Sequence, residues 1–158
     1  MELSHIDQNG NAIMVDVSNK DITCRKAVAQ GTILLNAPVF AAVQGGESKK
    51  GDILGVARVA GIMGAKNAAS LIPLCHVLPL TKCTVDFTLN PEACSLTAIC
   101  EVSVCGRTGV EMEAITGVSL ALITVYDMCK AIDKGMVLTD IHLVHKEGGK
   151  SGVYDAPQ

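Results

Sequence analysis

The sequence predicts an α+β fold of the ferredoxin-like type, with its elements in the order β-α-β-β-α-β. Two long segments, residues 52–71 and 111–132, repeat apolar residues at helical spacing. Four other segments are rich in β-branched residues or alternate apolar with polar residues, and these lie at residues 21–35, 83–89, 96–104 and 137–144. We therefore expect a four-stranded antiparallel sheet with two long helices on one face, in a single domain over residues 1–158.

Local signals place the elements of the N-terminal half. Residues 1–20 show no sustained core pattern, so we expect an arm or a short strand there. Asn36 is a suitable cap for a short helix over residues 38–43, because proline is tolerated in a first helical turn. The segment 45–51 is rich in glycine and lysine, which is typical of a mobile basic loop.

Similar local signals mark the boundaries of the remaining elements. Asp52 is the predicted N-cap of the first long helix, and Pro73 follows its end. This helix is rich in glycine and alanine, so it should pack closely against a neighbour. Residues 90–93 form a predicted turn between the two middle strands, and Gly135 closes the second long helix. The glycine-rich segment 145–158 is expected to be a mobile tail.

Composition limits the classes of function. The net charge of -3 and the absence of tryptophan, with only two tyrosines and two phenylalanines, argue against a nucleic-acid partner. The N-terminus has acidic residues and no apolar run, and the longest apolar stretch, residues 114–125, is interrupted by polar ones. We expect no membrane partner and a cytoplasmic location. The positive mean hydropathy favours assembly through an apolar face.

The seven cysteines do not suggest a disulfide framework or a metal site. They contain no C-x-x-C pair and are odd in number, so we expect reduced, mostly buried thiols. Cys100 and Cys105 are five residues apart on a strand and should face opposite sides of the sheet. The same reasoning places His142 and His145 on opposite faces. We predict no essential metal.

Asp127 and Lys130 are the first candidates for chemistry. They are three residues apart on the second long helix and share a face, either as a surface ion pair or as an acid/base pair. Glu113 lies 14 residues before Asp127 and is rotated from it by about 40° at 100° per residue. Two carboxylates on one weakly polar stripe suggest a cleft or a subunit interface.

His76 is held in an apolar turn between Pro73 and Pro79. It is either a hydrogen-bonded core histidine or a proton donor and acceptor near neutral pH. Cys75 has apolar neighbours and no adjacent base, which favours an inert thiol over a nucleophile.

The segment 148–152 resembles part of a phosphate loop. Val144 stands where the first glycine of that motif belongs, and no helix follows, so a nucleoside-triphosphatase site is rejected. The glycines can still turn backbone N–H groups toward an anion, and Lys146 and Lys150 can neutralise phosphate charge. Lys49, Lys50 and Arg25 are further candidates, although a lysine taken alone is more often a solvated side chain than a phosphate ligand.

Six blocks of the sequence resemble, in order and spacing, the MoaC family of molybdenum cofactor biosynthesis. They lie at residues 14–18, 50–52, 72–76, 108–114, 124–131 and 146–152. Members of that family convert 3',8-cyclo-7,8-dihydroguanosine 5'-triphosphate, made by a radical SAM GTP cyclase, into cyclic pyranopterin monophosphate with release of diphosphate. The resemblance implies a ferredoxin-like fold, a hexamer built from dimers, and sites at a subunit interface.

The resemblance also implies roles for residues. Asp127 and Lys130 would form the central acid/base pair, and His76 would act with them. Leu74, Cys75, Met112 and Glu113 would contact substrate, with Glu111 nearby. Lys50, Lys146 and Lys150 would hold the triphosphate, with no cofactor beyond a Mg²⁺ ion that the substrate could carry. One departure is Val77, which stands where the family usually has proline.

A second class of function is a non-catalytic, oligomeric nucleotide- or pterin-binding module of the same fold. It would use the lysines and glycines equally well. It would not require Asp127 and Lys130 to share a helix stripe with Glu113.

Overall fold

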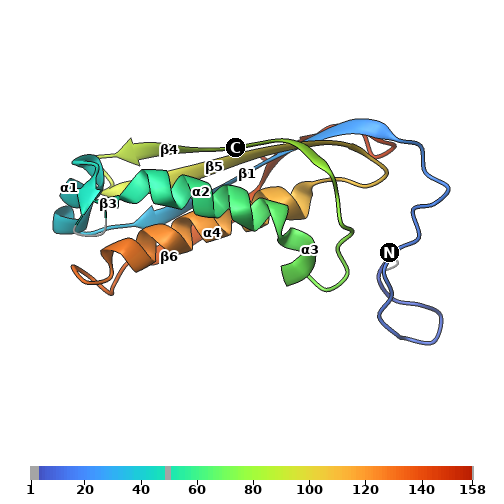
Figure 1. The fold of residues 1–158 in the computed structure, drawn as a ribbon, viewed down its shortest axis with the longest axis horizontal. Helices are drawn as coiled ribbons and strands as arrows, with labels where there is room; N and C mark the ends of the chain where they lie inside the picture. The colour runs from blue at the N-terminus through green and yellow to red at the C-terminus, as the bar shows by residue number, and fades with distance from the viewer. Residues whose placement is uncertain (1–3, 49–50, 158) are drawn as a thin grey trace.

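The computed structural model describes residues 4–48 and 51–157 (Figure 1). The long strands are β1 (Thr23–Leu34), β4 (Leu80–Asn90), β5 (Ser95–Gly106) and β6 (Val137–Glu147). The helices are α1 (Ala37–Gln44), α2 (Ile53–Lys66), α3 (Ala68–Leu71) and α4 (Glu111–Cys129). Three two-residue strands complete the described part, namely β2 (Glu47–Ser48), β3 (Gly51–Asp52) and β7 (Tyr154–Asp155).

The main sheet has the strand order β4-β5-β1-β6-β7, with every neighbouring pair antiparallel. The four long strands have the order and direction of a ferredoxin-like sheet, and α2 and α4 cover one of its faces, so the predicted fold is confirmed (Figure 1). The fifth strand, β7, was not predicted. The opposite face carries polar side chains, among them the hydrogen-bonded pair Thr32 and Thr97 and the Lys82–Glu101 ion pair.

Capping explains where the first helices begin. The Asn36 side chain accepts a hydrogen bond from the Val39 N–H at 3.0 Å, and the Asp52 side chain accepts one from the Gly55 N–H at 2.9 Å. Both predicted caps are confirmed. The predicted helix over residues 52–71 is broken at Asn67, whose side chain donates to the Met63 carbonyl at 2.8 Å and so satisfies a carbonyl at the end of α2.

Close contacts fix α4 between the sheet and α2. A Cβ atom added to Gly61 of α2 would lie 2.9 Å from the Gly117 carbonyl oxygen, and one on Gly117 would lie 2.6 Å from the Cys100 sulfur. A Cβ on Gly31 of β1 would lie 2.8 Å from Val118. Glycine at these positions lets two helices and a sheet approach more closely than side chains would allow. The middle of the predicted polar stripe of α4 therefore packs against α2 and is not a cleft.

A bulge in β6 determines which side chains of that strand face the helices. Leu143 pairs with Ala29 and Lys146 pairs with Ala27, and both alanines are buried on the helix face. Leu143 and Lys146 are three residues apart, so the extra residue between them, Val144, reverses the alternation of the strand. Lys146 therefore points toward α4.

The same bulge corrects a prediction about the two histidines of β6. His142 pairs with Gln30 and His145 with Val28, and both partners lie on the face away from the helices. The expectation that His142 and His145 face opposite sides is therefore wrong.

The predicted start of the C-terminal tail, at residue 145, is also wrong. β6 continues to Glu147, and Tyr154 and Asp155 return to pair with Lys146 and His145. The His145 Nδ1 atom lies 2.8 Å from an Asp155 carboxylate oxygen, which ties the returning strand to β6.

Two of the seven cysteines form a disulfide, Cys24 with Cys105, contrary to the expectation that all are reduced. The two residues lie directly opposite each other in the β1–β5 register. The sequence could not show this because the pairing depends on register rather than on spacing. Cys105 is exposed and Cys100 is buried in the core, so the prediction that these two face opposite sides is confirmed.

Among the described helices, α4 is long and apolar enough to span a membrane by length and composition alone. In this fold 56% of its most apolar stretch is buried, as in a core helix between a sheet and a second helix.

The helix layer has two distinct ends (Figure 1). Gly61 of α2 contacts Gly117 and Ala121 of α4, whereas Gly64, one turn later, contacts Thr116 and Leu120, so the two helices run antiparallel. The start of α4 lies with α3, the following loop and the N-terminal arm. The end of α4 lies with the start of α2, together with β3 and α1 (Figure 1).

Substitution Gly61→Ala should lower the free energy of unfolding by about 1–3 kcal/mol, because the new methyl group meets backbone that cannot move aside cheaply. This cost outweighs the gain of about 0.5–1 kcal/mol expected from alanine in a helix. Urea denaturation measures the difference. Lys66→Ala, at the exposed end of the same helix, is the control and should change stability by less than about 0.5 kcal/mol. A Gly61→Ala protein as stable as wild type would contradict the close approach.

Candidate functional site

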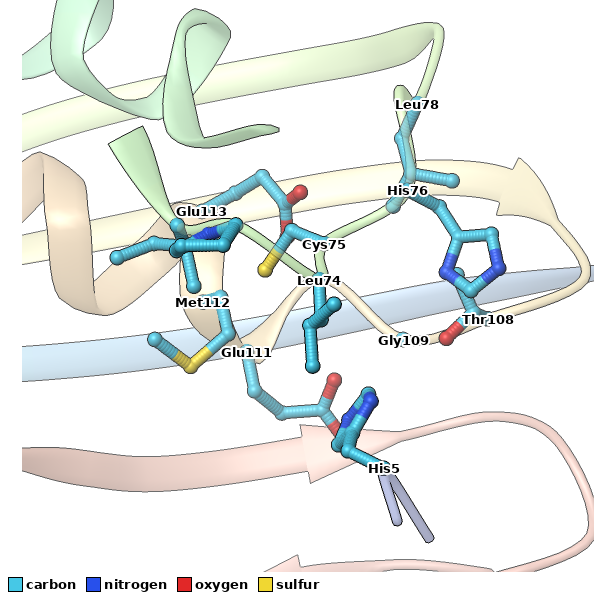
Figure 2. A pocket seen from close by; sticks show the side chains of 12 residues that line it. His5, Leu74, Cys75, His76, Leu78, Thr108, Gly109, Glu111, Met112 and Glu113 are labelled. Atoms are coloured by element: carbon cyan, nitrogen blue, oxygen red, sulfur yellow. The ribbon is translucent and has the colours of Figure 1, made fainter. Parts of the chain in front are cut away.

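A pocket of about 440 Å³ lies where the loop after α3 meets the first turn of α4 (Figure 2). Six residues predicted from the sequence line it, namely Leu74, Cys75, His76, Glu111, Met112 and Glu113. The loop presents its side chains because Pro73 ends the helical segment, and α4 presents Glu111 to Glu113 in its first turn. The pocket thus joins two blocks of sequence some 35 residues apart. The strands β4 and β5 lie between these blocks in the chain.

Glu113 is a buried carboxyl group in this pocket, with only 4% of the residue exposed. Burial, and to a smaller degree the nearby Glu111 charge, raises the pKa of Glu113 above its ordinary value, although a hydrogen bond from its own backbone N–H opposes the rise. Burial and the Glu113 charge likewise raise the pKa of the Cys75 thiol. Cys75 is therefore a neutral thiol at neutral pH, which supports the interpretation that it is not a nucleophile.

His76 is fixed by the N-terminal arm. Its Nε2 atom lies 2.8 Å from the Val15 carbonyl oxygen. A carbonyl can only accept, so Nε2 carries the proton and, in the neutral ring, Nδ1 is the acceptor. Val77, the departure from the family pattern, is 89% exposed, so its side chain packs against little of the described structure. The imidazole is held by the Val15 carbonyl and does not depend on Val77 for this contact.

Lys146 lies beside this pocket and contacts Glu111, one of the residues that line it. Its Nζ atom donates to a Glu111 carboxylate oxygen at 2.9 Å and lies 3.4 Å from the Ser151 hydroxyl. Both charged side chains are more than two-thirds buried, which strengthens their attraction relative to a surface pair. The Val144 bulge makes this contact possible, since it turns Lys146 to the helix face.

A second pocket of about 440 Å³ lies next to Lys146, where the start of β1 meets the glycine-rich loop after β6. Three cations and one carboxylate line it, together with Ser151; the charged residues are Lys20, Arg25, Lys150 and Asp21. Gly149 has φ +76°, and a Cβ there would collide with the Arg25 guanidinium, so the loop can wrap this arginine only with glycine. Because Lys146 contacts Ser151, it stands between the two pockets.

Asp127 and Lys130 lie at the other end of α4. Their side chains form an ion pair at 2.6 Å, and the Asp127 carboxylate raises the pKa of the Lys130 ammonium group. At 1.5 Å per residue, Asp127 is about 21 Å from Glu113 along the helix axis. The prediction that Asp127 and Lys130 share a helix face is therefore confirmed. Within one chain, however, the pair does not lie at the pocket.

The predicted site was incomplete in two places. Lys50 lies outside the described residues, so its position stays a prediction. His5 and Thr108 line the first pocket, and Lys20 and Thr23 the second, but none was assigned a role from the sequence. Thr108 lies in a block that resembles the MoaC family, which was a usable signal, whereas the other three had none.

Within residues 4–48 and 51–157, no three histidine, cysteine, aspartate or glutamate side chains are gathered as a metal-binding group. The His145 and Asp155 side chains, 2.8 Å apart, join β6 to β7.

Comparison with known proteins identifies the family. The family model described as MoaC family matches residues 14–149. The chain belongs to the MoaC family. The cyclic pyranopterin monophosphate synthase of Clostridium botulinum is 57% identical over 151 residues, which cover 96% of this chain and 95% of that protein. Proteins of the same name from Cereibacter sphaeroides and Clostridium perfringens are 53% and 51% identical over 154 residues, covering 98% of this chain and 97% and 98% of theirs. The MoaC match includes the residues of both pockets except for His5, Lys150 and Ser151.

Burial of Glu113 gives a pH dependence of stability. Because the folded protein holds the Glu113 proton more tightly than the unfolded chain, stability falls as the pH rises from about 4.5 toward the raised pKa. Glu113→Gln removes this cost of ionisation. We expect the free energy of unfolding of the variant, minus that of wild type, to be larger at pH 7 than at pH 4. Urea denaturation at the two pH values measures this difference.

The control for this measurement is Glu92→Gln in the exposed turn between β4 and β5. The difference in free energy of unfolding between this variant and wild type should be nearly the same at both pH values. A pH-independent difference for Glu113→Gln would contradict a buried carboxyl with a raised pKa.

Proposed function

We propose that this protein is a cyclic pyranopterin monophosphate synthase, a lyase of molybdenum cofactor biosynthesis. It converts 3',8-cyclo-7,8-dihydroguanosine 5'-triphosphate into cyclic pyranopterin monophosphate and diphosphate. The observation that carries the proposal is the pocket that both His76 and Glu113 line, beside the Lys146–Glu111 pair and next to a second pocket with three cations. Membership of the MoaC family and the names of its relatives support the same reaction.

The first pocket suits the guanine-derived part of the substrate. Converting a purine into a pterin requires ring opening and reclosure, so protons must be delivered to and removed from several heteroatoms. Glu113, with its raised pKa, can donate a proton, and the Nδ1 atom of His76 can accept one. Leu74 and Met112 supply apolar walls for the ring system.

The second pocket suits the triphosphate. A ribose hydroxyl attacks the phosphorus that is retained, and diphosphate leaves, so negative charge develops on the departing oxygens. Lys150 and Arg25 in this pocket, with Lys146 at its boundary, can neutralise that charge. A Mg²⁺ ion carried by the substrate would add to the same effect.

The remaining catalytic groups are supplied by a second subunit. Asp127 and Lys130 lie too far along α4 to serve the pocket of their own chain. A twofold axis across the helix layer would bring this end of one chain to the pocket end of its partner. The exposed apolar side chains Val56, Val59 and Met63 on α2 provide surface for such a contact. Three dimers of this kind would form the hexamer.

In the cell, the substrate comes from a radical SAM GTP cyclase, and both enzymes act in the cytoplasm. The chain uses no resident cofactor in this account. Side chains transfer the protons and neutralise the charge that develops when the ribose hydroxyl displaces diphosphate.

Purified protein mixed with the cyclised GTP intermediate tests the proposal. We expect diphosphate and cyclic pyranopterin monophosphate in equal amounts, detected by a coupled phosphate assay and by chromatography. Tight binding of the intermediate without diphosphate release would contradict catalysis and would instead support the non-catalytic binding module.

Mixed variants test the shared site in the same assay. His76→Ala and Asp127→Ala should each lose about 10²-fold or more in turnover, the loss typical of removing a general acid or base. When the two inactive proteins are unfolded, mixed and refolded together, about a quarter of the sites combine two intact halves, so activity should return to that level. A mixture of His76→Ala with Glu113→Ala is the control and should stay inactive, because both residues belong to the same half. No recovery in the first mixture would contradict a site built from two chains.

A further inference from the structure

We propose that His5 is a second proton-transferring imidazole of this site, presented to the substrate by a hairpin of the N-terminal arm. His5 lines the first pocket together with Glu111 and Thr108 (Figure 2). It lies outside residues 14–149, which match the MoaC family, and no role was assigned to it from the sequence. The inference rests on the proposed function, because it names a further residue for that reaction.

The hairpin that carries His5 is ordered by its own hydrogen bonds. The Ile13 N–H donates to the His5 carbonyl at 3.0 Å, and Ile6 and Ala12 form a β-bridge. The Asp7 carboxylate closes the turn by accepting bonds from the Asn9 N–H at 2.9 Å and the Asn11 N–H at 2.8 Å. These bonds define the shape of a segment that buries few of its side chains, so the hairpin is ordered although it adds little to the core.

The same stretch of backbone orients both imidazoles of the pocket. The His5 Nδ1 atom lies 3.3 Å from the Ile13 carbonyl oxygen, and the His76 Nε2 atom lies 2.8 Å from the Val15 carbonyl oxygen. Since each carbonyl can only accept, Nδ1 of His5 and Nε2 of His76 carry the protons. The neutral rings therefore offer Nε2 of His5 and Nδ1 of His76 as acceptors, so the two histidines can take protons at different atoms of one ligand.

The proposed reaction has a proton-transfer step that His5 could carry out. Ring opening and reclosure move more than one proton, and His76 can hold only one at a time. In the proposed step, the lone pair on His5 Nε2 takes a proton from a nitrogen or oxygen of the bound substrate, and the resulting imidazolium returns that proton to substrate or to water. No electrons are gained or lost. The His5 residue is exposed, so it exchanges protons with solvent between turnovers.

His5→Ala tests the role through chemical rescue. We expect the turnover number to fall by about 10- to 100-fold, with a change of less than about threefold in KM, because the proton-transfer step is removed while the ligand contacts of the pocket remain. Added imidazole should restore much of the lost rate, since the exposed position leaves room for a small base at the same place. His142→Ala is the matched control, because His142 lies on the far face of the sheet and its loss should leave turnover unchanged with or without imidazole.

Three results would overturn parts of this account in different ways. An active wild-type protein with an equally active His5→Ala variant would overturn the role of His5 alone. A loss in His5→Ala that imidazole does not restore would also overturn it, since a purely structural role predicts no rescue. A wild-type protein that releases no diphosphate would overturn the proposed function, and the role of His5 with it.

Discussion

The position of α4 between the sheet and α2 is the constraint on which the rest of the structure depends. Glycine stands at the close contacts on both sides of this helix, with Gly31 on the sheet side and Gly61 on the α2 side. A helix held this tightly cannot slide or rotate without collision, because packed interiors have few voids to absorb the movement. Its first turn therefore stays against the loop that carries His76, and its last turn stays about 21 Å away. A twofold dimer could bring the pocket of one chain and the Asp127–Lys130 pair of another together, because they lie at opposite ends of one rigid helix.

Burial at the first turn of α4 sets the protonation of the groups that meet there. Glu113 and Cys75 line the same pocket, and burial raises the pKa of each, which pushes each toward its neutral form. Glu111 has a different environment because Lys146 neutralises it at 2.9 Å. Two carboxyl groups two residues apart are thus given different properties by their surroundings, since one is held toward its protonated form and the other anchors a lysine beside the second pocket.

Much of this could be predicted from sequence, because the deciding interactions are local. The caps at Asn36 and Asp52 depend on residues three positions away, and the sharing of one helix face by Asp127 and Lys130 depends on helical period alone. What could not be predicted depends on register or on distant contacts. The bulge at Val144 leaves no sequence signal, yet it decides that Lys146 faces α4. The position of His5 depends on the folding of an arm whose pattern of residues resembles no regular element.

The central claim is that one catalytic site takes one end of α4 from each of two chains. A crystal structure of the His76→Ala protein with the cyclised GTP intermediate bound tests it most directly. We expect the guanine-derived ring to lie within hydrogen-bonding distance of Glu113 of one subunit and of Asp127 and Lys130 of a second, with the triphosphate beside Lys150. A ligand bound by Glu113 with Asp127 and Lys130 of every subunit remote from it would contradict the account.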